Sequence, residues 1–235
     1  MHKTYFNWST GKDSALALYY LQKDNLFKVK KLVTTINNHY NRVTMHGLRR
    51  ELLNAQIKAL DIPFQTIELP EQPTIKDYEA IMYKSINELK DNKFTHSAFG
   101  DIFLEDLKQY RVNQLSQLHI ECVFPLWKKN TIQLIHEFVA LGFKAVVICA
   151  DATYFDESFI GTEIDTEFIS KLPENVDPCG ENGEFHTFCY DGPIFKYTVP
   201  FQLKETIYRE YDTPNTTNEK SGFWYGDLTL DHQNH

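Results

Sequence analysis

The chain alternates between two patterns of hydrophobic positions. Short apolar runs predict buried strands at residues 4–8, 31–36, 64–69, 96–103 and 122–126. Apolar residues spaced three and four positions apart predict a helix after each strand, as in the series Tyr78, Ile81, Met82, Ile86 and Leu89. This alternation favours an α/β fold with a parallel sheet and helices on both faces, because right-handed crossovers return each helix to the sheet.

The pattern changes in the last third of the chain. A helical pattern at residues 132–141 and an apolar run at 145–150 continue the alternation. Beyond about Glu174, turn residues separate aromatic and β-branched runs at residues 185–190 and 195–201. Such runs predict antiparallel strands in a second, smaller part of the protein.

We therefore expect two domains, a parallel α/β domain of residues 1–127 and a smaller mixed domain of residues 128–235. The chain has 235 residues, of which 42% are hydrophobic and 24% charged, and this composition is typical of globular proteins. No run approaches the roughly 18 to 20 apolar residues that span a bilayer. The N-terminus also enters a strand pattern without a secretory apolar region, so we expect a cytoplasmic protein with no membrane partner.

Charge and cysteine content narrow the range of partners. The formal charge of -8 argues against a broad basic surface for nucleic acid. The four cysteines form no C-x-x-C pair, which disfavours a disulfide framework or a structural metal site. The sequence leaves both a monomer and a homodimer open.

The turn between the first strand and the first helix carries a candidate phosphate site. Ligands of open parallel sheets bind at the carboxyl ends of the strands. Small residues let backbone N–H groups approach an oxyanion, and a helix start adds unpaired N–H groups and a positive dipole end. The turn reads Ser9, Thr10, Gly11, Lys12, Asp13 and Ser14, in which Lys12 adds a full positive charge.

This turn does not match the P-loop G-x-x-x-x-G-K-[ST]. Phe6 occupies the first glycine position, and Asp13 follows Lys12 where a serine or threonine is required. An ATPase of that class is therefore a poor fit. An ordinary capped helix start is the alternative interpretation, because aspartate and serine are good N-caps.

A second polar cluster lies in the smaller domain. Glu181, Asn182, Glu184 and His186 offer acceptors, an amide and a titratable imidazole within a few residues, a density more typical of a site than of a packing surface. The alternative is a hairpin with solvated carboxylates, because Asn182-Gly183 is also a strong signal for a tight turn.

Both motifs resemble known families. The first resembles the PP-loop S-G-G-K-D-S of the ATP pyrophosphatases (adenine nucleotide alpha hydrolase-like proteins), with Thr10 in place of the middle glycine. The second, G-E-N-G-E-F-H-T followed by D-G-P, resembles the diphthine–ammonia ligase family. Short motifs at residues 98–102 and at His46-Gly47 are also similar to those of this family, so the resemblance covers the chain from about residue 4 to residue 200.

The resemblance implies a ligase that splits ATP into AMP and pyrophosphate, adenylates a carboxylate and amidates it with ammonia. It implies that ATP is bound by Ser9, Thr10, Gly11, Lys12, Asp13, Ser14, Gly100 and Asp101, with Mg²⁺ at Asp13 and Asp101. It implies that the carboxylate substrate or ammonia is bound by Glu181, Asn182, Gly183, Glu184 and His186. The catalytic residues implied are Lys12, Asp13, Glu184 and His186.

Two other functions stay open at this point. In a PP-loop sulfur transferase, Cys179 would carry the sulfur as a persulfide, whereas a nucleotide-binding module would sense ATP without turnover. Pyrophosphate release separates the second of these from a ligase. The acceptor also stays open, because diphthine occurs only in archaea and eukaryotes. The ammonia source is likewise open.

Overall fold

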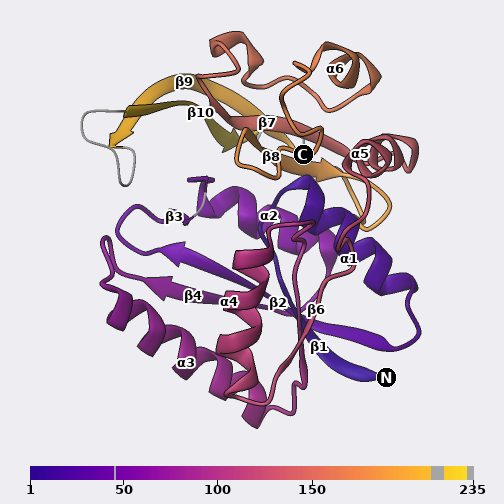
Figure 1. The fold of residues 1–235 in the computed structure, drawn as a ribbon, viewed down its shortest axis with the longest axis vertical. Helices are drawn as coiled ribbons and strands as arrows, with labels where there is room; N and C mark the ends of the chain where they lie inside the picture. Colours follow the sequence, from indigo (N-terminus) through magenta and orange to yellow (C-terminus); the bar gives the residue numbers. More distant parts are fainter. Residues whose placement is uncertain (45, 213–219, 232–235) are drawn as a thin grey trace.

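The computed structural model describes residues 1–44, 46–212 and 220–231. Two sheets lie one above the other (Figure 1). The lower sheet and its helices come from the first half of the chain, and the upper sheet comes from the second half.

The first sheet is parallel except for one short strand. Its strands are β1 (His2–Asn7), β2 (Phe27–Asn37), β3 (Arg42–Val43), β4 (Phe64–Leu69), β5 (His96–Ala98) and β6 (Glu121–Val123). The order β2-β1-β5-β6 puts β1 inside the sheet, and both β4 and the antiparallel β3 pair with β2. The loop after β1 therefore emerges between neighbouring strands, where parallel sheets bind ligands.

Helices cover both faces of this sheet, as predicted. They are α1 (Lys12–Lys23), α2 (Arg50–Leu60), α3 (Ile75–Asp91) and α4 (Glu105–Ser116). Successive residues of a strand point to opposite faces. Phe6 accordingly belongs to the core that contains α1 and α2, whereas Tyr5 belongs to the separate core under α3 and α4.

The second sheet is antiparallel, in the order β8-β7-β10-β9. Its strands are β7 (Lys144–Asp151), β8 (Phe185–Asp191), β9 (Phe201–Asp212) and β10 (Lys220–Leu230). The helix α5 (Thr131–Ala140), the 3-10 helix η1 (Glu157–Phe159) and the helix α6 (Thr166–Lys171) complete this half.

Three expectations about strands need correction. The apolar run at 145–150 does not extend the parallel alternation, because β7 pairs only with antiparallel neighbours. A fully apolar run has the same pattern in either kind of sheet. Of the run 195–201, only Phe201 lies in a strand, since Pro200 has no N–H for a ladder. The predicted strand 96–103 ends at Ala98.

The two halves share one hydrophobic core. A single cluster of buried side chains runs from Phe6 and Leu16 in the first half to Phe138 and Val147 in the second. The edge strand β8 also donates a hydrogen bond from Cys189 N to Thr10 O at 2.9 Å. Among the described residues, no helix is long and apolar enough to cross a membrane.

Candidate active site

The Ser9–Ser14 turn holds an unusual backbone conformation. Thr10 has a φ of 72°, a region that β-branched residues rarely adopt. Two donors fix its carbonyl oxygen, Gln56 Nε2 at 2.9 Å and Cys189 N at 2.9 Å. A Cβ on Gly11 would lie 3.1 Å from Thr187 O, so only glycine fits there without a shift. The surrounding protein, and not the turn sequence alone, imposes this shape.

His46 is a site residue that the sequence analysis did not select. Its Nε2 lies 2.7 Å from Ser9 O and 3.2 Å from Thr10 Oγ1. Because a carbonyl only accepts, Nε2 carries the proton and donates it to Ser9. Nδ1 is buried and has no hydrogen-bond partner among the described residues. Burial lowers the pKa of His46, which keeps this neutral form.

Lys12 lies at the centre of the site. Its side chain is only 3% exposed, and Nζ is 2.7 Å from Asp13 Oδ2 and also donates to Cys179 O. Its backbone N donates to Thr187 Oγ1 at 3.0 Å. Burial opposes the charged form, but the negative groups around it, with Asp13 the largest, outweigh this and raise the pKa of Lys12. A buried, permanent cation therefore lies beside the turn.

Glu184 organises the loop of the second motif. Its carboxylate is buried and accepts hydrogen bonds from Asp177 N at 2.9 Å, Asn182 N at 3.0 Å and Asn182 Nδ2 at 3.0 Å. Three donors occupy most of its acceptor capacity. The carboxylate therefore holds the loop from Asp177 to Glu184 in shape.

Glu181 connects this loop to the first half of the chain. Its Oε1 accepts from Ile102 N at 2.7 Å and from Phe103 N at 3.3 Å, just after β5. Burial raises the pKa of Glu181 to about 7, although the two backbone donors work against this. This carboxyl group can therefore exchange a proton near neutral pH.

His186 faces His46 across the turn. Their ring centroids are 6.2 Å apart, and no hydrogen bond to the His186 ring is found among the described residues. The ring is partly exposed. Burial of most of the ring is the largest cause that lowers the pKa of His186 to about 3, and electrostatic interactions with His46 and Lys12 lower it further. The imidazole is therefore neutral at physiological pH. Asn182 is exposed, and Gly183 has a φ of 93°.

Asp101 and Gly100 lie at the end of β5, beside the start of α1. A Cβ on Gly100 would lie 3.0 Å from Ser14 N, so this glycine permits close packing against the helix start. Asp101 Oδ2 lies 2.8 Å from Arg111 Nε, and Asp101 interacts electrostatically with Asp13. Within the described ranges, no group of three or more histidine, cysteine, aspartate or glutamate side chains is arranged to hold a metal ion.

The structure thus brings most predicted residues together from both halves. Lys12, Asp13 and Glu181 interact directly or electrostatically, and His186 lies within the field of Lys12. Three residues that shape the turn were not predicted from the sequence, namely His46, Gln56 and Thr187. Two of them lie in segments that resemble the family, namely His46 in His46-Gly47 and Thr187 at the end of G-E-N-G-E-F-H-T.

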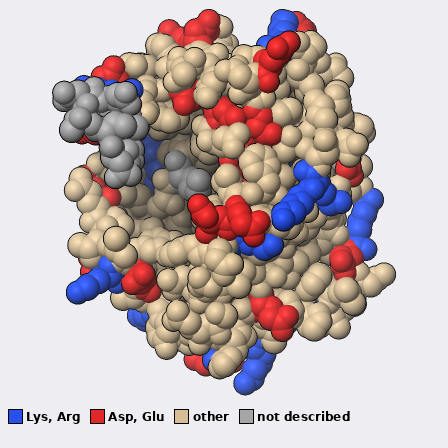
Figure 2. Space-filling view, in the orientation of Figure 1, with Lys and Arg blue, Asp and Glu red and all other residues tan. Residues whose placement is uncertain are grey.

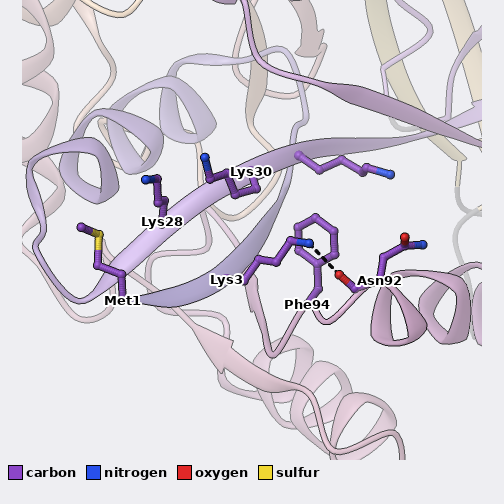
Figure 3. A pocket seen from close by; sticks show the side chains of 7 residues that line it. Met1, Lys3, Lys28, Lys30, Asn92 and Phe94 are labelled. Carbon is purple, nitrogen blue, oxygen red and sulfur yellow. Dashed lines mark hydrogen bonds between the residues drawn. The ribbon is translucent and has the colours of Figure 1, made fainter.

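A hollow of about 530 Å³ elsewhere does not belong to this site. It lies at the amino ends of β1 and β2, the opposite end of β1 from the Ser9–Ser14 turn (Figure 3). Lys28 and Lys30 project from β2 there, whereas Lys3 bonds Asn92 O at 2.6 Å and lies over the Phe94 ring. It is a basic patch on an acidic protein.

A parallel sheet with the Ser9–Ser14 turn between β1 and α1, packed against an antiparallel sheet, is the arrangement that the resemblance to the ATP pyrophosphatases predicts. The family model described as the diphthamide synthase N-terminal domain matches residues 2–117. The model described as the diphthamide synthase C-terminal domain matches residues 130–217. The chain belongs to the diphthine–ammonia ligase family.

Curated relatives agree with this assignment. The chain is 25% identical to diphthine–ammonia ligase of Danio rerio over 155 residues, which are 62% of the chain and 60% of that relative. It is 27% identical to the Mus musculus enzyme over 137 residues, covering 56% of the chain and 51% of the relative. The Schizosaccharomyces pombe enzyme is 27% identical over 59% of the chain and 24% of its own length. The chain thus spans little more than half of the first two relatives.

Proposed function

We propose that this protein is an ATP-dependent ligase that adenylates a carboxylate and then amidates it with ammonia. One observation carries the proposal. The buried cation of Lys12, on the PP-loop, lies within the electrostatic reach of Glu181 and His186, which come from the second motif. A polyphosphate and a group able to exchange a proton can therefore meet in one place.

The turn suits the phosphates of ATP. The start of α1 offers backbone N–H groups beyond that of Lys12, which donates to Thr187, and the Lys12 side chain adds a positive charge. Mg²⁺ is usually held by one or two carboxylates together with substrate phosphates. Asp13 and Asp101 are the carboxylates that would take that role, since they are close enough to interact, and each would then share its charge between the metal and the cationic side chain that it now pairs with. When bound, the metal would neutralise charge on the phosphates.

The proposed reaction has two steps. In the first, an oxygen of the substrate carboxylate bonds to the α-phosphorus of ATP, the bond to the β-phosphate oxygen breaks, and pyrophosphate leaves. Lys12 and the turn amides stabilise the charge that gathers on it. In the second, ammonia attacks the activated acyl carbon and AMP leaves. The structure supports Glu181 as the group that takes the proton from ammonia, because its pKa of about 7 is suited to this transfer.

The other implied roles are divided by the geometry. We propose that Glu184 positions the loop and does not transfer the proton, since it already accepts three hydrogen bonds. Neutral His186, with Asn182 and Gly183, would accept hydrogen bonds from ammonia or orient the acceptor. We propose a carboxylic acid as that acceptor, and the relatives' name makes diphthine one candidate.

A sulfur-transfer function has weaker support. The Cys179 thiol is buried, and its Sγ lies 3.4 Å from Thr131 O. Burial raises the pKa of Cys179 well above its usual value, whereas a sulfur carrier needs an accessible thiolate.

The first test is isothermal titration with a non-hydrolysable ATP analogue and Mg²⁺, using the wild type, Lys12→Ala and Lys23→Ala. Lys23 is an exposed lysine at the far end of the same helix and serves as the matched control. Pyrophosphate release is then measured with ammonium and a panel of carboxylic acids. Binding lost only in Lys12→Ala, with AMP and pyrophosphate formed from one acid, supports the ligase. Absence of nucleotide binding by the wild type contradicts the proposal.

A further inference from the structure

Three aromatic side chains gather on the hairpin formed by β9 and β10. The ring centroids of Tyr211 and Phe223 are 6.2 Å apart, and Tyr225 lies 6.4 Å from each of them. Tyr211 is 46% exposed, and the other two rings are half-buried. We call these three residues the aromatic triad. Together their rings form one aromatic surface, in which the Tyr225 hydroxyl also interacts with Tyr211 and Cys149. Contiguous exposed apolar patches mark binding sites.

The aromatic triad lies on the same face of the second sheet as His186. Strand pairing places Tyr225 opposite Cys149, and Cys149 opposite His186. Directly paired residues of antiparallel strands point to the same face. Phe223 lies two residues from Tyr225 and therefore shares this face, and its contact with Tyr211 places that ring there too.

This face is turned toward the first domain. Asp227 follows Tyr225 by two residues, before the irregularity in the β9–β10 pairing at Asp227/Leu228. Its carboxylate reaches Arg49 Nε and Arg42 Nη2, both at 2.9 Å, beside α2 and β3. Figure 2 shows the molecule hollowed between the β9–β10 hairpin and the part of the first domain that lies below it.

We propose that the aromatic triad holds the apolar, preferably aromatic, end of the carboxylic acid whose carboxylate is activated beside His186. This inference rests on the proposed ligase function and names the class of its acceptor. Neighbouring strands lie about 4.8 Å apart, so the path from β8 across β7 to Tyr225 on β10 spans roughly 10 Å, and Tyr211 lies one strand further, on β9. The acceptor is therefore an elongated acid whose carboxylate and apolar end are separated by at least that length.

The same hairpin supplies a matched control. Tyr208 lies three residues before Tyr211 on β9 and so points to the opposite face, where its ring is 4.9 Å from that of Trp224. It is 45% exposed, nearly the same as Tyr211. Loss of the Tyr211 ring removes two cross-strand aromatic contacts and loss of the Tyr208 ring removes one, but only Tyr211 belongs to the proposed binding surface.

The experiment uses ω-phenylalkanoic acids of increasing chain length as probes. Their binding to the protein saturated with a non-hydrolysable ATP analogue is measured by isothermal titration, and pyrophosphate release with ATP and ammonium is measured in parallel. The proteins are the wild type, Tyr211→Ala, Phe223→Ala, Tyr211→Phe and Tyr208→Ala, with thermal unfolding recorded for each.

We expect affinity to rise with chain length until the phenyl ring reaches the aromatic triad. Tyr211→Ala and Phe223→Ala should then weaken the binding of the long acids about tenfold, as expected for loss of a buried aromatic contact. Short acids should bind equally to all variants. Tyr211→Phe and Tyr208→Ala should resemble the wild type.

Three outcomes would overturn the inference. The first is an affinity for the acids that does not depend on their chain length. The second is an equal loss of affinity for the long acids in Tyr208→Ala. The third is weaker binding of the ATP analogue by Tyr211→Ala. The last would mean that the aromatic triad holds the nucleobase. Binding that depends on the triad but yields no pyrophosphate from any acid would retain the triad as a site for an apolar acid and contradict the ligase function, so the two failures are distinguishable.

Discussion

The Glu181 carboxyl group ties the proposed chemistry to pH. Its pKa is raised to about 7, so the carboxylate that can accept a proton is formed only as the pH rises through that value. Lys12 and Asp13 are the charged groups that act on it, with opposite effects. We therefore expect amide formation, at a fixed concentration of free ammonia, to increase through pH 7 and to level off above it.

The substitution Glu181→Gln should remove this increase and lower the rate about 100-fold, the lower range for loss of a general base. Product formation followed from pH 5.5 to 9 tests it. Glu174→Gln, which changes an exposed carboxylate before the same loop, is the control and should keep the wild-type profile. An unchanged profile in Glu181→Gln would assign the proton transfer to another group.

His46 shows how a single side chain can fix the PP-loop. Replacement by alanine leaves Ser9 O without its buried donor, which should lower the free energy of unfolding by about 1 to 3 kcal/mol and weaken binding of the ATP analogue. His46→Gln can restore a donor and should recover part of both losses. Chemical denaturation and titration measure the two effects. His39→Ala, at an exposed histidine in the turn between β2 and β3, should change neither.

At the scale of elements, Asp227 links the hairpin to the first sheet. This carboxylate is 7% exposed and binds both Arg42 and Arg49, and the hydrogen bond from Arg49 is the main reason that the pKa of Asp227 is lowered. A lowered pKa means that the stabilisation is present above the usual aspartate value and is lost as the pH falls through the folded-state value.

Asp227→Asn should therefore destabilise the protein by about 1.5 to 3 kcal/mol at neutral pH, the cost of losing hydrogen bonds to charged groups. The difference from the wild type should shrink in acid. Urea unfolding of the two proteins at neutral pH and at acidic pH provides the measurement. Asp61→Asn breaks an ion pair with Lys196 in which both side chains are more than 60% exposed, and it should have almost no effect. Equal effects of the two substitutions would show that Asp227 is not a structural link.

Elements with a clear period were predictable, whereas contacts between distant segments were not. The spacing of Ile81, Ile86 and Leu89 gave α3 because an amphipathic helix has its own period. The run at residues 145–150 gave a strand but not its sheet, since pairing partners leave no mark on a fully apolar segment. The same limit applies to the candidate active site, where local sequence was informative and long-range contacts were not. The turn sequence indicated a phosphate loop, but nothing in it showed that Gln56 and Cys189 bind the Thr10 carbonyl.

At the scale of the whole molecule, the predicted boundary between residues 127 and 128 stays a proposal. It falls in the stretch between the two family models, which end at residue 117 and begin at residue 130. Contacts across it are extensive, because Thr187, Cys179 and Cys189 beyond the boundary all bind the Ser9–Ser14 turn. The candidate active site is therefore formed by residues from both halves of the chain, and neither sequence motif alone indicates these contacts.

These shared contacts predict that the protein unfolds as one unit. One hydrophobic cluster includes Phe6 and Leu18 of the first half with Phe138 and Phe188 of the second, so neither half can open without exposing the core of the other. Scanning calorimetry should show a single transition whose calorimetric and van't Hoff enthalpies agree. A saturating ATP analogue with Mg²⁺ should move that transition upward as a whole, and Lys12→Ala should abolish the shift. Two transitions, with only the first moved by the nucleotide, would instead mean that the PP-loop is held by its own domain and that the contacts from β8 contribute little to it.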